Sequence, residues 1–315
     1  MKNIIQLENI TKSYDANKVV DNLSFNVKKG HILGFLGPNG AGKSTTIGMI
    51  STLINQDSGR ILYKGEDVDS CRQKFKSELG VVPQDLAIYE DLTAYQNVKF
   101  FASLYGIPKK YINNVCEQAL EFVGLETVKN KKAKTYSGGM KRRLNIACSL
   151  VNAPKLIILD EPTVGIDPQS RNYILDSIRK LQSKGVSVIY TTHYMEEIEA
   201  IADDVVIMDH GRVLVNDTLE NVHNQFLTHS TITLKLDDSM NDNQVNELHM
   251  TCGVKDIEME KNTYKFCVDY TENKDIITDI MKVCDKWNKK IISVNTNHMD
   301  LEDIFLKLTG SKLRD

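Results

Sequence analysis

The sequence predicts an α/β protein: a core of strands and helices that carries an inserted helical subdomain, followed by a small α+β domain. The first observation is a glycine-rich loop at 37–44, which follows an apolar run and opens a helical stretch. The second is a long helical stretch with short apolar runs on both sides of it. The third is a change of pattern near residue 225. A chain of 315 residues suits two domains, because domains usually contain roughly 100–200 residues.

The first predicted domain, 1–225, alternates short apolar runs with helical patterns. The runs predict strands at 4–10, 31–36, 61–63, 81–82, 156–159, 186–190 and 205–208. A helix is expected from Lys43 onward. Between about 86 and 152 we expect the helical subdomain, because apolar side chains recur there at three- and four-residue spacing, as at Val98, Phe101, Ala102 and Tyr105.

The second predicted domain, 226–315, has the β-α-β-β-α-β order of a ferredoxin-like unit, with one added helix. Strands are expected at 231–236, 254–259, 264–269 and 290–294, and helices at 243–250, 275–287 and 300–308. One apolar stripe runs along the second helix and consists of Ile276, Ile277, Ile280, Cys284 and Trp287. Asp300 and Asp303 suit the start of the last helix, where carboxylates cap the exposed N–H groups.

Composition narrows the class of protein. A formal net charge of −3 argues against a nucleic-acid binder, which usually carries excess positive charge. The six cysteines include no C-x-x-C pair, so we expect reduced thiols in the cytosol rather than disulfides or a zinc site. We also expect no secretory leader. No apolar run approaches the roughly 18–20 residues of a membrane span, so any work at a membrane requires a partner.

A phosphate-binding loop is the first motif that carries chemistry. The loop fits G-x-x-x-x-G-K-[ST] and reads Gly37-Pro38-Asn39-Gly40-Ala41-Gly42-Lys43-Ser44, with Thr45 following in the helix. Its glycines allow backbone N–H groups to face phosphate, and the helix N-terminus adds positive potential. Lys43 is expected to bridge the β- and γ-phosphates and Ser44 to ligate Mg²⁺. The alternative is a glycine-rich turn with a chance lysine, which the strand–helix context disfavours.

Two acidic residues end the apolar run at 156–159. Asp160 follows a buried strand, so its carboxylate needs a cation, and the Mg²⁺ on Ser44 is the natural one. Glu161 comes next and is expected to reach the γ-phosphate and activate a water molecule. A solvated loop acid is the alternative for Glu161 when the residue is considered alone.

A second candidate anion site is Ser137-Gly138-Gly139, which precedes a helical stretch. Ser137 suits an N-cap, and the two glycines leave the helix N-terminus open to an anion. A turn that only caps a helix is the alternative. Because the loop at 37–44 already serves one nucleotide, a second site makes best sense if it closes over a nucleotide held by another copy of the chain.

Three single residues complete the candidate site. His193 and Gln84 each follow a predicted strand, where side chains of an α/β sheet point to the ligand crevice. Gln84 offers an amide oxygen to Mg²⁺ or water. Tyr14 offers a ring on which a base can stack. For each residue, taken alone, a structural role is the alternative.

Together these residues resemble the ATP-binding subunits of ABC transporters, because seven elements occur in that family's order over about 1–225. Tyr14 resembles the adenine-stacking aromatic residue, 37–44 the Walker A motif and Gln84 the Q-loop glutamine. The stretch Tyr136–Met140 resembles the signature motif. Asp160 with Glu161 resembles the Walker B motif and its catalytic glutamate, Asp167 belongs to the D-loop, and His193 resembles the switch histidine.

The chain departs from the family pattern at three positions. Tyr136 and Met140 replace the common Leu and Gln of the signature, and Ile166 replaces the Leu of the D-loop. These substitutions resemble the branch that energises multidrug, antibiotic-resistance and lipid exporters. The stretches 89–93, 100–106 and 301–310 resemble the same branch.

The resemblance implies a P-loop NTPase core with an antiparallel β subdomain, and two nucleotide-binding subunits that meet head to tail around two ATP molecules. An identical copy is the favoured second subunit. Lys43 of one subunit holds the phosphates, while Ser137, Gly138 and Gly139 of the other close over the γ-phosphate. Catalysis of ATP hydrolysis falls to Glu161, His193, Lys43 and Gln84, and Asp167 also belongs to the nucleotide site.

The implied setting is the cytoplasmic face of the cell membrane, where the helical subdomain grips a separate permease subunit. A soluble ATPase of the same family, acting on ribosomes or DNA, is the alternative, although this chain has neither two cassettes nor a long coiled coil. We expect residues 226–315 to serve in dimerisation or in docking to a partner rather than in ligand sensing. The sequence shows no cluster of residues there that would bind a ligand.

Overall fold

The computed structural model describes residues 2–15, 17–225, 230–270, 272–297 and 300–310. The chain divides into two compact units, an N-terminal unit that ends at Leu219 and a C-terminal unit from Glu220 to Gly310. Each unit has its own hydrophobic core.

The N-terminal unit begins with an antiparallel sheet, as the family resemblance implied. Its strand order is β2-β1-β4-β5, with bounds β1 Asn3–Tyr14, β2 Asn17–Lys28, β4 Ser58–Tyr63 and β5 Glu66–Asp67. The sequence reading did not identify β2. Its buried residues Leu23, Phe25 and Val27 alternate, but Val20 is out of phase with them because the pairing with β1 shifts register.

A six-stranded sheet in the order β10-β9-β3-β8-β7-β6 forms the centre of this unit. The bounds are β3 Ile32–Leu36, β6 Leu79–Val82, β7 Leu156–Asp160, β8 Ser187–Thr191, β9 Asp204–Asp209 and β10 Arg212–Thr218. The neighbouring strands from β9 to β6 are parallel. Every residue of β3 and β8 is buried, which explains why these strands read as continuous apolar runs. The carboxyl ends of the parallel strands meet at one edge, where ligands bind in such sheets.

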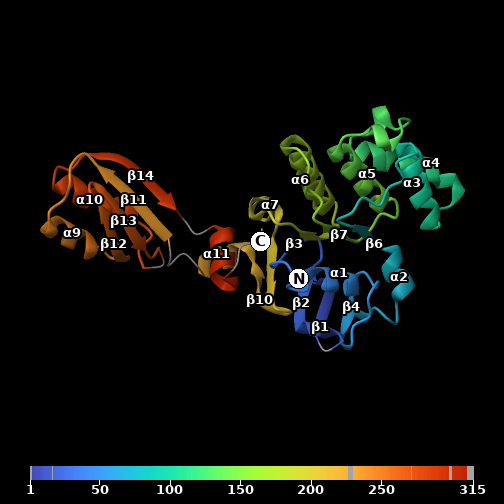
Figure 1. Ribbon diagram of the computed structural model, residues 1–315, viewed down its shortest axis with the longest axis horizontal. Coiled ribbons are helices and arrows are strands. Elements are labelled where there is room, and N and C mark those ends of the chain that lie inside the picture. The colour runs from blue at the N-terminus through green and yellow to red at the C-terminus, as the bar shows by residue number, and fades with distance from the viewer. Residues whose placement is uncertain (1, 16, 226–229, 271, 298–299, 311–315) are drawn as a thin grey trace. The chain divides into compact units, whose positions relative to one another are not determined.

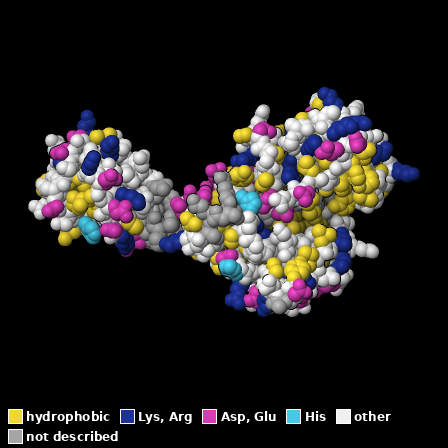
Figure 2. All heavy atoms as spheres, in the orientation of Figure 1, with side chains coloured by type: hydrophobic (Ala, Val, Ile, Leu, Met, Phe, Trp, Pro, Cys, Tyr) yellow, Lys and Arg dark blue, Asp and Glu magenta, His cyan; other side chains and the backbone are white. Residues whose placement is uncertain are grey.

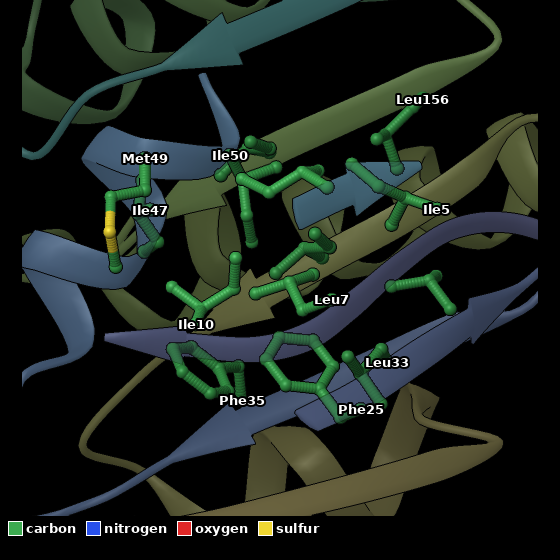
Figure 3. Packing of buried hydrophobic residues seen from close by; sticks show 14 of the residues in the cluster. Ile5, Leu7, Ile10, Phe25, Leu33, Phe35, Ile47, Met49, Ile50 and Leu156 are labelled. Atoms are coloured by element: carbon green, nitrogen blue, oxygen red, sulfur yellow. The ribbon is translucent and has the colours of Figure 1, made fainter. Parts of the chain in front are cut away.

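The hydrophobic core of this unit joins the two sheets. Figure 3 shows Ile5, Leu7 and Phe25 from the antiparallel sheet together with Leu33 and Phe35 from β3. The rings of Phe25 and Phe35 stack with 5.4 Å between their centroids. This packing fixes β3 close to its end, and hence the loop that follows β3, against the antiparallel sheet.

The predicted helical subdomain contains three α-helices, which lie together in Figure 1: α3 Ala94–Leu104, α4 Lys109–Phe122 and α5 Gly138–Leu150. The 3₁₀ turns η1 Glu126–Val128 and η2 Ala133–Thr135 connect α4 to α5. Thr93 and Gln96 form a capping box at the start of α3. Chain reversals at Gly106 and Gly124, which both have positive φ, separate the helices.

Helix α1 Lys43–Ile50 confirms the helix expected from Lys43 onward. Three further helices of the N-terminal unit were not singled out from the sequence: α2 Arg72–Ser77, α6 Pro168–Ser183 and α7 Met195–Ile201. Over the described ranges, no helix has both the length and the apolar character needed to cross a bilayer.

The C-terminal unit confirms the predicted β-α-β-β-α-β order with an added helix. Its elements are β11 Ser230–Leu236, α9 Asp242–His249, β12 Val254–Glu260, β13 Thr263–Val268, α10 Ile276–Lys286, β14 Ile291–Asn297 and α11 Leu301–Thr309, preceded by α8 Leu219–Gln225. The antiparallel sheet has the order β12-β13-β11-β14. Asp300 caps α11 by accepting from the Asp303 N–H at 2.8 Å, as predicted for this position.

The apolar stripe of α10 contributes to the core of the C-terminal unit. Ile276, Ile280 and Cys284 are buried. The indole of Trp287, just beyond the helix, is 38% exposed and donates from Nε1 to Glu247 at 2.8 Å. The stripe therefore reaches solvent at its last residue, where a polar partner on α9 takes the indole N–H.

Candidate functional site

A cavity of about 370 Å³ lies at the carboxyl edge of the parallel strands. It brings together residues from the phosphate-binding loop and from the ends of three strands. Its lining consists of Val19, Asn39, Gly40, Gly42, Lys43, Ser44, Thr45, Gln84, Asp160, Glu161 and His193. All but Val19 were predicted as site residues from the sequence.

Two glycines of the loop are required by close backbone contacts. Gly42 has φ 102°, and a Cβ atom added there would lie 2.7 Å from the carbonyl oxygen of Val19. A Cβ atom on Gly37 would lie 2.5 Å from the carbonyl oxygen of Met208. The loop therefore packs closely against β2 and β9. Its curved backbone can bind a chain of phosphate groups. Ala41, predicted to contact nucleotide, has its side chain in the buried core.

Lys43 places its ammonium group among backbone carbonyls. Nζ donates to the carbonyl oxygens of Gly37 at 2.6 Å and Pro38 at 3.0 Å. Burial lowers the pKa of this lysine, while the charges of Glu161 and Asp160 oppose that change. A desolvated cation with neutral partners gains most from a nearby anion, so the cavity suits a phosphate group.

The backbone turns at the end of β7, so that the consecutive residues Asp160 and Glu161 both line the cavity. Glu161 has φ 48°, a left-handed conformation that is uncommon for a residue other than glycine. Thr191 holds the turn in place, because its carbonyl oxygen and Oγ1 accept from the Glu161 N–H at 3.2 and 3.0 Å. Thr191 Oγ1 also donates to Asp160 Oδ1 at 2.6 Å. The sequence reading missed Thr191, since nothing local marks a strand-end threonine as a partner of residues about 30 positions earlier.

The Glu161 carboxylate lies between two of the other three candidate catalytic residues, Gln84 and His193. Gln84 Nε2 donates to Oε2 at 2.8 Å, and His193 Nε2 lies 2.5 Å from Oε1. Glu161 is only 8% exposed. The second ring nitrogen of His193, Nδ1, is buried and has no hydrogen-bond partner among the described residues. The three predicted side chains thus form one connected polar group beside Lys43.

Arg142 is a further residue that sequence reasoning missed. It comes from α5, is buried, and donates to the carbonyl oxygens of Pro83 at 2.9 Å and Gln84 at 2.7 Å. Burial lowers its pKa, while the negative charge of Asp85, Asp160 and Glu161 opposes the change. This side chain connects the first turns of α5 to the backbone of Gln84, so the helical subdomain and the cavity are mechanically linked.

The second predicted anion site lies outside this cavity. Ser137 caps α5 by accepting from the Met140 N–H at 3.3 Å, as predicted. Asp167 caps α6 in the same way, with the Ser170 N–H at 2.9 Å. A Cβ atom on Gly139 would lie 2.1 Å from Ser170 Oγ, so the two helix starts are in close contact.

Gly138 differs from its neighbour because it faces open space. The nearest heavy atom to a Cβ built on Gly138 is 4.0 Å away. Tyr14, at the end of β1, also lies apart from the lining of the cavity; its ring is 46% exposed, and Lys12 Nζ lies 5.7 Å from the ring centroid. Base stacking on Tyr14 therefore stays a prediction.

Known proteins resemble this chain over most of its length. The profile of the family described as "ABC transporter" matches residues 20–164. The linearmycin resistance ATP-binding protein LnrL of Bacillus subtilis is 38% identical over 99% of this chain and 100% of its own length. The daunorubicin/doxorubicin resistance ATP-binding protein DrrA of Streptomyces peucetius is 32% identical over 99% of this chain and 94% of its own. A solved dimeric ATP-binding cassette, in a post-hydrolysis state with ADP and Pi, is 25% identical, covers 68% of this chain and 98% of its own, and has a TM-score of 0.62.

Proposed function

This chain belongs to the ATP-binding proteins of the ABC transporter family, and we propose that ATP hydrolysed in the cavity beside Lys43 drives export of a drug-, antibiotic- or lipid-like substrate through a separate membrane subunit. The observation that carries this proposal is the placement of Glu161 between Gln84 and His193, next to a lysine held by the phosphate-binding loop. Such a group combines phosphate binding with a carboxylate that orients water.

The phosphate-binding loop and Lys43 hold the phosphates of ATP in this proposal. Backbone N–H groups of the loop and the N-terminus of α1 supply positive potential. Thr45 lines the same cavity. Tyr14 stacks on the adenine ring, for which its half-exposed ring is suited.

The cavity also suits Mg²⁺. Ser44 and Asp160 line it with a hydroxyl and a carboxylate oxygen, and Gln84 adds an amide oxygen. These are the ligands that Mg²⁺ prefers, together with substrate phosphates and water. When bound, the ion neutralises charge on the β- and γ-phosphate oxygens.

Glu161 positions the attacking water and accepts its proton. Its carboxylate is held from both sides, because Gln84 donates to one oxygen and His193 lies against the other. His193 offers its imidazole to the γ-phosphate as a hydrogen-bond donor. The phosphate acquires negative charge as the bond to the leaving oxygen breaks, and this contact stabilises that charge. Gln84 passes changes at the cavity to the helical subdomain through the bonds from Arg142.

The nucleotide site is completed by a second copy of this chain. Ser137, Gly138 and Gly139 start a helix that does not line the cavity of the same chain. We infer that they, with Asp167, close over the γ-phosphate held by the partner's loop. The open space at Gly138 supports this inference, since a group from outside the chain has room to approach.

A pair of glycine variants tests the site between two copies. Gly138→Ala should fold with nearly parental stability, because the nearest atom to its new methyl group outside the adjoining residues of its own helix is the Gly165 carbonyl oxygen at 4.0 Å. Its ATP turnover should fall at least about tenfold through a clash at the partner's nucleotide. Gly139→Ala is the comparison: overpacking against Ser170 should cost about 1–3 kcal/mol of unfolding free energy. Thermal unfolding and steady-state ATPase assays measure both effects. Parental turnover in Gly138→Ala would contradict closure by a second copy.

The membrane partner docks on the helical subdomain. Figure 2 shows hydrophobic side chains gathered on the surface in this region of the view. Exposed aromatic and aliphatic side chains on α3 and in the segments that flank it include Tyr89, Phe100, Leu104 and Tyr105. The rings of Tyr89 and Phe100 meet edge to face with centroids 5.0 Å apart. We propose that a cytoplasmic helix of the permease packs there, which places the protein on the cytoplasmic face of the cell membrane.

Affinity purification of the tagged chain from detergent-solubilised membranes tests the transporter assignment. Recovery of a multispanning membrane protein is the expected result, and substitution of Phe100 and Leu104 by Ser should reduce it without loss of nucleotide binding. Recovery of ribosomes with no membrane protein would replace the transporter by a soluble ATPase of the same family. The compounds to which LnrL and DrrA are named as resistance proteins, linearmycin and daunorubicin/doxorubicin, indicate the class of compound with which to challenge cells.

A further inference from the structure

A second cavity, of about 670 Å³, lies at the opposite edge of the parallel sheet from the ATP cavity. Lys155 directly precedes β7, Lys184 precedes β8 by three residues, and Lys29 precedes β3 by three residues. Lys2 and Lys64, from the start of β1 and the end of β4, line the same cavity. Three lysines thus lie at the amino ends of parallel strands, on the side of the sheet away from the catalytic group, and two lysines of the antiparallel sheet line the same cavity.

The cavity has a strong positive charge that the chain itself leaves mostly uncompensated. None of the described residues that line it is Asp or Glu. Lys64 pairs with Glu78 at 2.5 Å, but the other four lysines form no ion pair with any residue that the structure describes. The whole chain has a formal net charge of −3, so this concentration of positive charge is a local feature rather than a consequence of a basic protein.

The lysines project from backbone segments that are bonded to one another. The Lys29 N–H donates to the Lys2 carbonyl at 3.0 Å, and the Lys64 N–H donates to the Ile4 carbonyl at 2.8 Å. Ser187 connects the remaining segments: its N–H donates to the Lys155 carbonyl at 3.0 Å, and its Oγ accepts from the Gly30 N–H at 2.8 Å. The relative positions of the five Cα atoms are therefore set by the sheet, even though the side chains end in solvent.

We propose that this cavity binds a small anion with several phosphate groups. Lysine ammonium groups act as compact point charges with three donors each, which suits the many oxygens of a polyphosphate. Lysine ammonium groups, with no acidic side chain among the described lining residues, disfavour a cation as the ligand. Among those residues, no base or nucleophile other than lysine lines the cavity, so we assign it a binding role rather than a chemical one.

Two sources share this chemistry: a free polyphosphate and the phosphomonoester head group of a lipid. Calorimetric titration with tripolyphosphate in magnesium-free buffer tests the first source. The titration uses the Lys43→Ala variant, so that the phosphate-binding loop contributes little. One bound tripolyphosphate per chain is expected, with an affinity that falls steeply as salt is added. Flotation with vesicles that contain phosphatidic acid, against pure phosphatidylcholine vesicles, tests the second source.

The decisive variant replaces Lys2, Lys29, Lys155 and Lys184, the cavity lysines without an ion pair among the described residues, by Gln in the Lys43→Ala background. Lys184 Nζ lies 4.9 Å from the centroid of the Phe122 ring, a contact that does not neutralise its charge. Affinity for tripolyphosphate should fall at least about 30-fold, because several charge-assisted contacts are lost together. A control removes the same charge from exposed lysines outside the cavity: Lys76, Lys109, Lys110 and Lys131. The control should retain binding, and thermal unfolding should show that both variants fold.

Each outcome has a definite reading. Lysine-dependent binding of tripolyphosphate supports the site with a free anion as ligand, whereas lysine-dependent flotation alone supports it with a lipid head group. Equal losses in the cavity variant and in the control, or no binding to either probe, overturn the proposal. Because the test is a binding measurement in a background without Lys43, it is independent of whether the chain hydrolyses ATP.

Discussion

Glu161→Gln is expected to bind ATP but to hydrolyse it at least about 100-fold more slowly than the parental chain, since a positioned general base contributes about 10²–10⁴-fold to such reactions. The amide has the size of the carboxylate, so its Oε atom still accepts from Gln84, which donates to Glu161 Oε2 at 2.8 Å in the parental chain. What the variant loses is the ability to take a proton from water. ATP that cannot be hydrolysed should hold two copies together.

Two measurements check this expectation. Steady-state phosphate release gives the rate, and gel filtration with and without ATP should show a dimer only with ATP. Glu196→Gln is a suitable control, because Glu196 is an exposed acid on the first turn of α7, three residues after His193. Turnover at the parental rate in Glu161→Gln, with Glu196→Gln also unchanged, would remove Glu161 from the role of base.

Lys43→Ala is expected to weaken ATP binding by roughly 10- to 150-fold, which corresponds to the 1.5–3 kcal/mol of one hydrogen bond to a charged group. The structure adds a second cost. The ammonium group donates to the carbonyl oxygens of Gly37 and Pro38 at 2.6 and 3.0 Å. Its removal leaves these carbonyls without that donor and takes away one of the positive charges that oppose Asp160 and Glu161. Repulsion of the phosphates should follow.

A fluorescent ATP analogue measures the affinity of Lys43→Ala, and phosphate release measures its turnover. Lys76→Ala, at an exposed position on α2, controls for the loss of one positive charge. Since hydrolysis needs the same lysine to hold the phosphates, both quantities should fall together. Parental affinity and turnover would mean that ATP is not held by this loop.

Local signals in the sequence predicted the parts of the site that local chemistry builds. The loop at 37–44 is recognisable because its local backbone conformation requires glycine. Gly42 has a positive φ, and neither Gly42 nor Gly37 has room for a side chain. The caps at Ser137 and Asp300 are recognisable for a similar reason, because a capping side chain bonds to an N–H only three residues away. The buried strands were predicted by uninterrupted apolar runs, as in β3 and β7.

Longer-range partners had no comparable signal. Arg142 is one of two adjacent arginines in α5, and only the folded chain shows that it bonds to Pro83 and Gln84 rather than facing solvent. Strand β2 was missed because irregular register with β1 breaks its alternation. The five lysines of the second cavity are spread from residue 2 to residue 184, and none stands in a motif.

The sequence by itself determined the family, the phosphate-binding loop and the types of residue that carry the chemistry, because each depends on contacts within a few positions. Only the tertiary structure decided how these residues meet. Gln84 and Glu161 are 77 positions apart, yet they form a hydrogen bond because β6 and β7 are parallel neighbours whose carboxyl ends lie at one edge of the sheet. The same alignment places the amino ends of β3, β7 and β8 at the other edge, where the lysines gather. Strand pairing is a long-range property of the folded chain, so no local pattern encodes it.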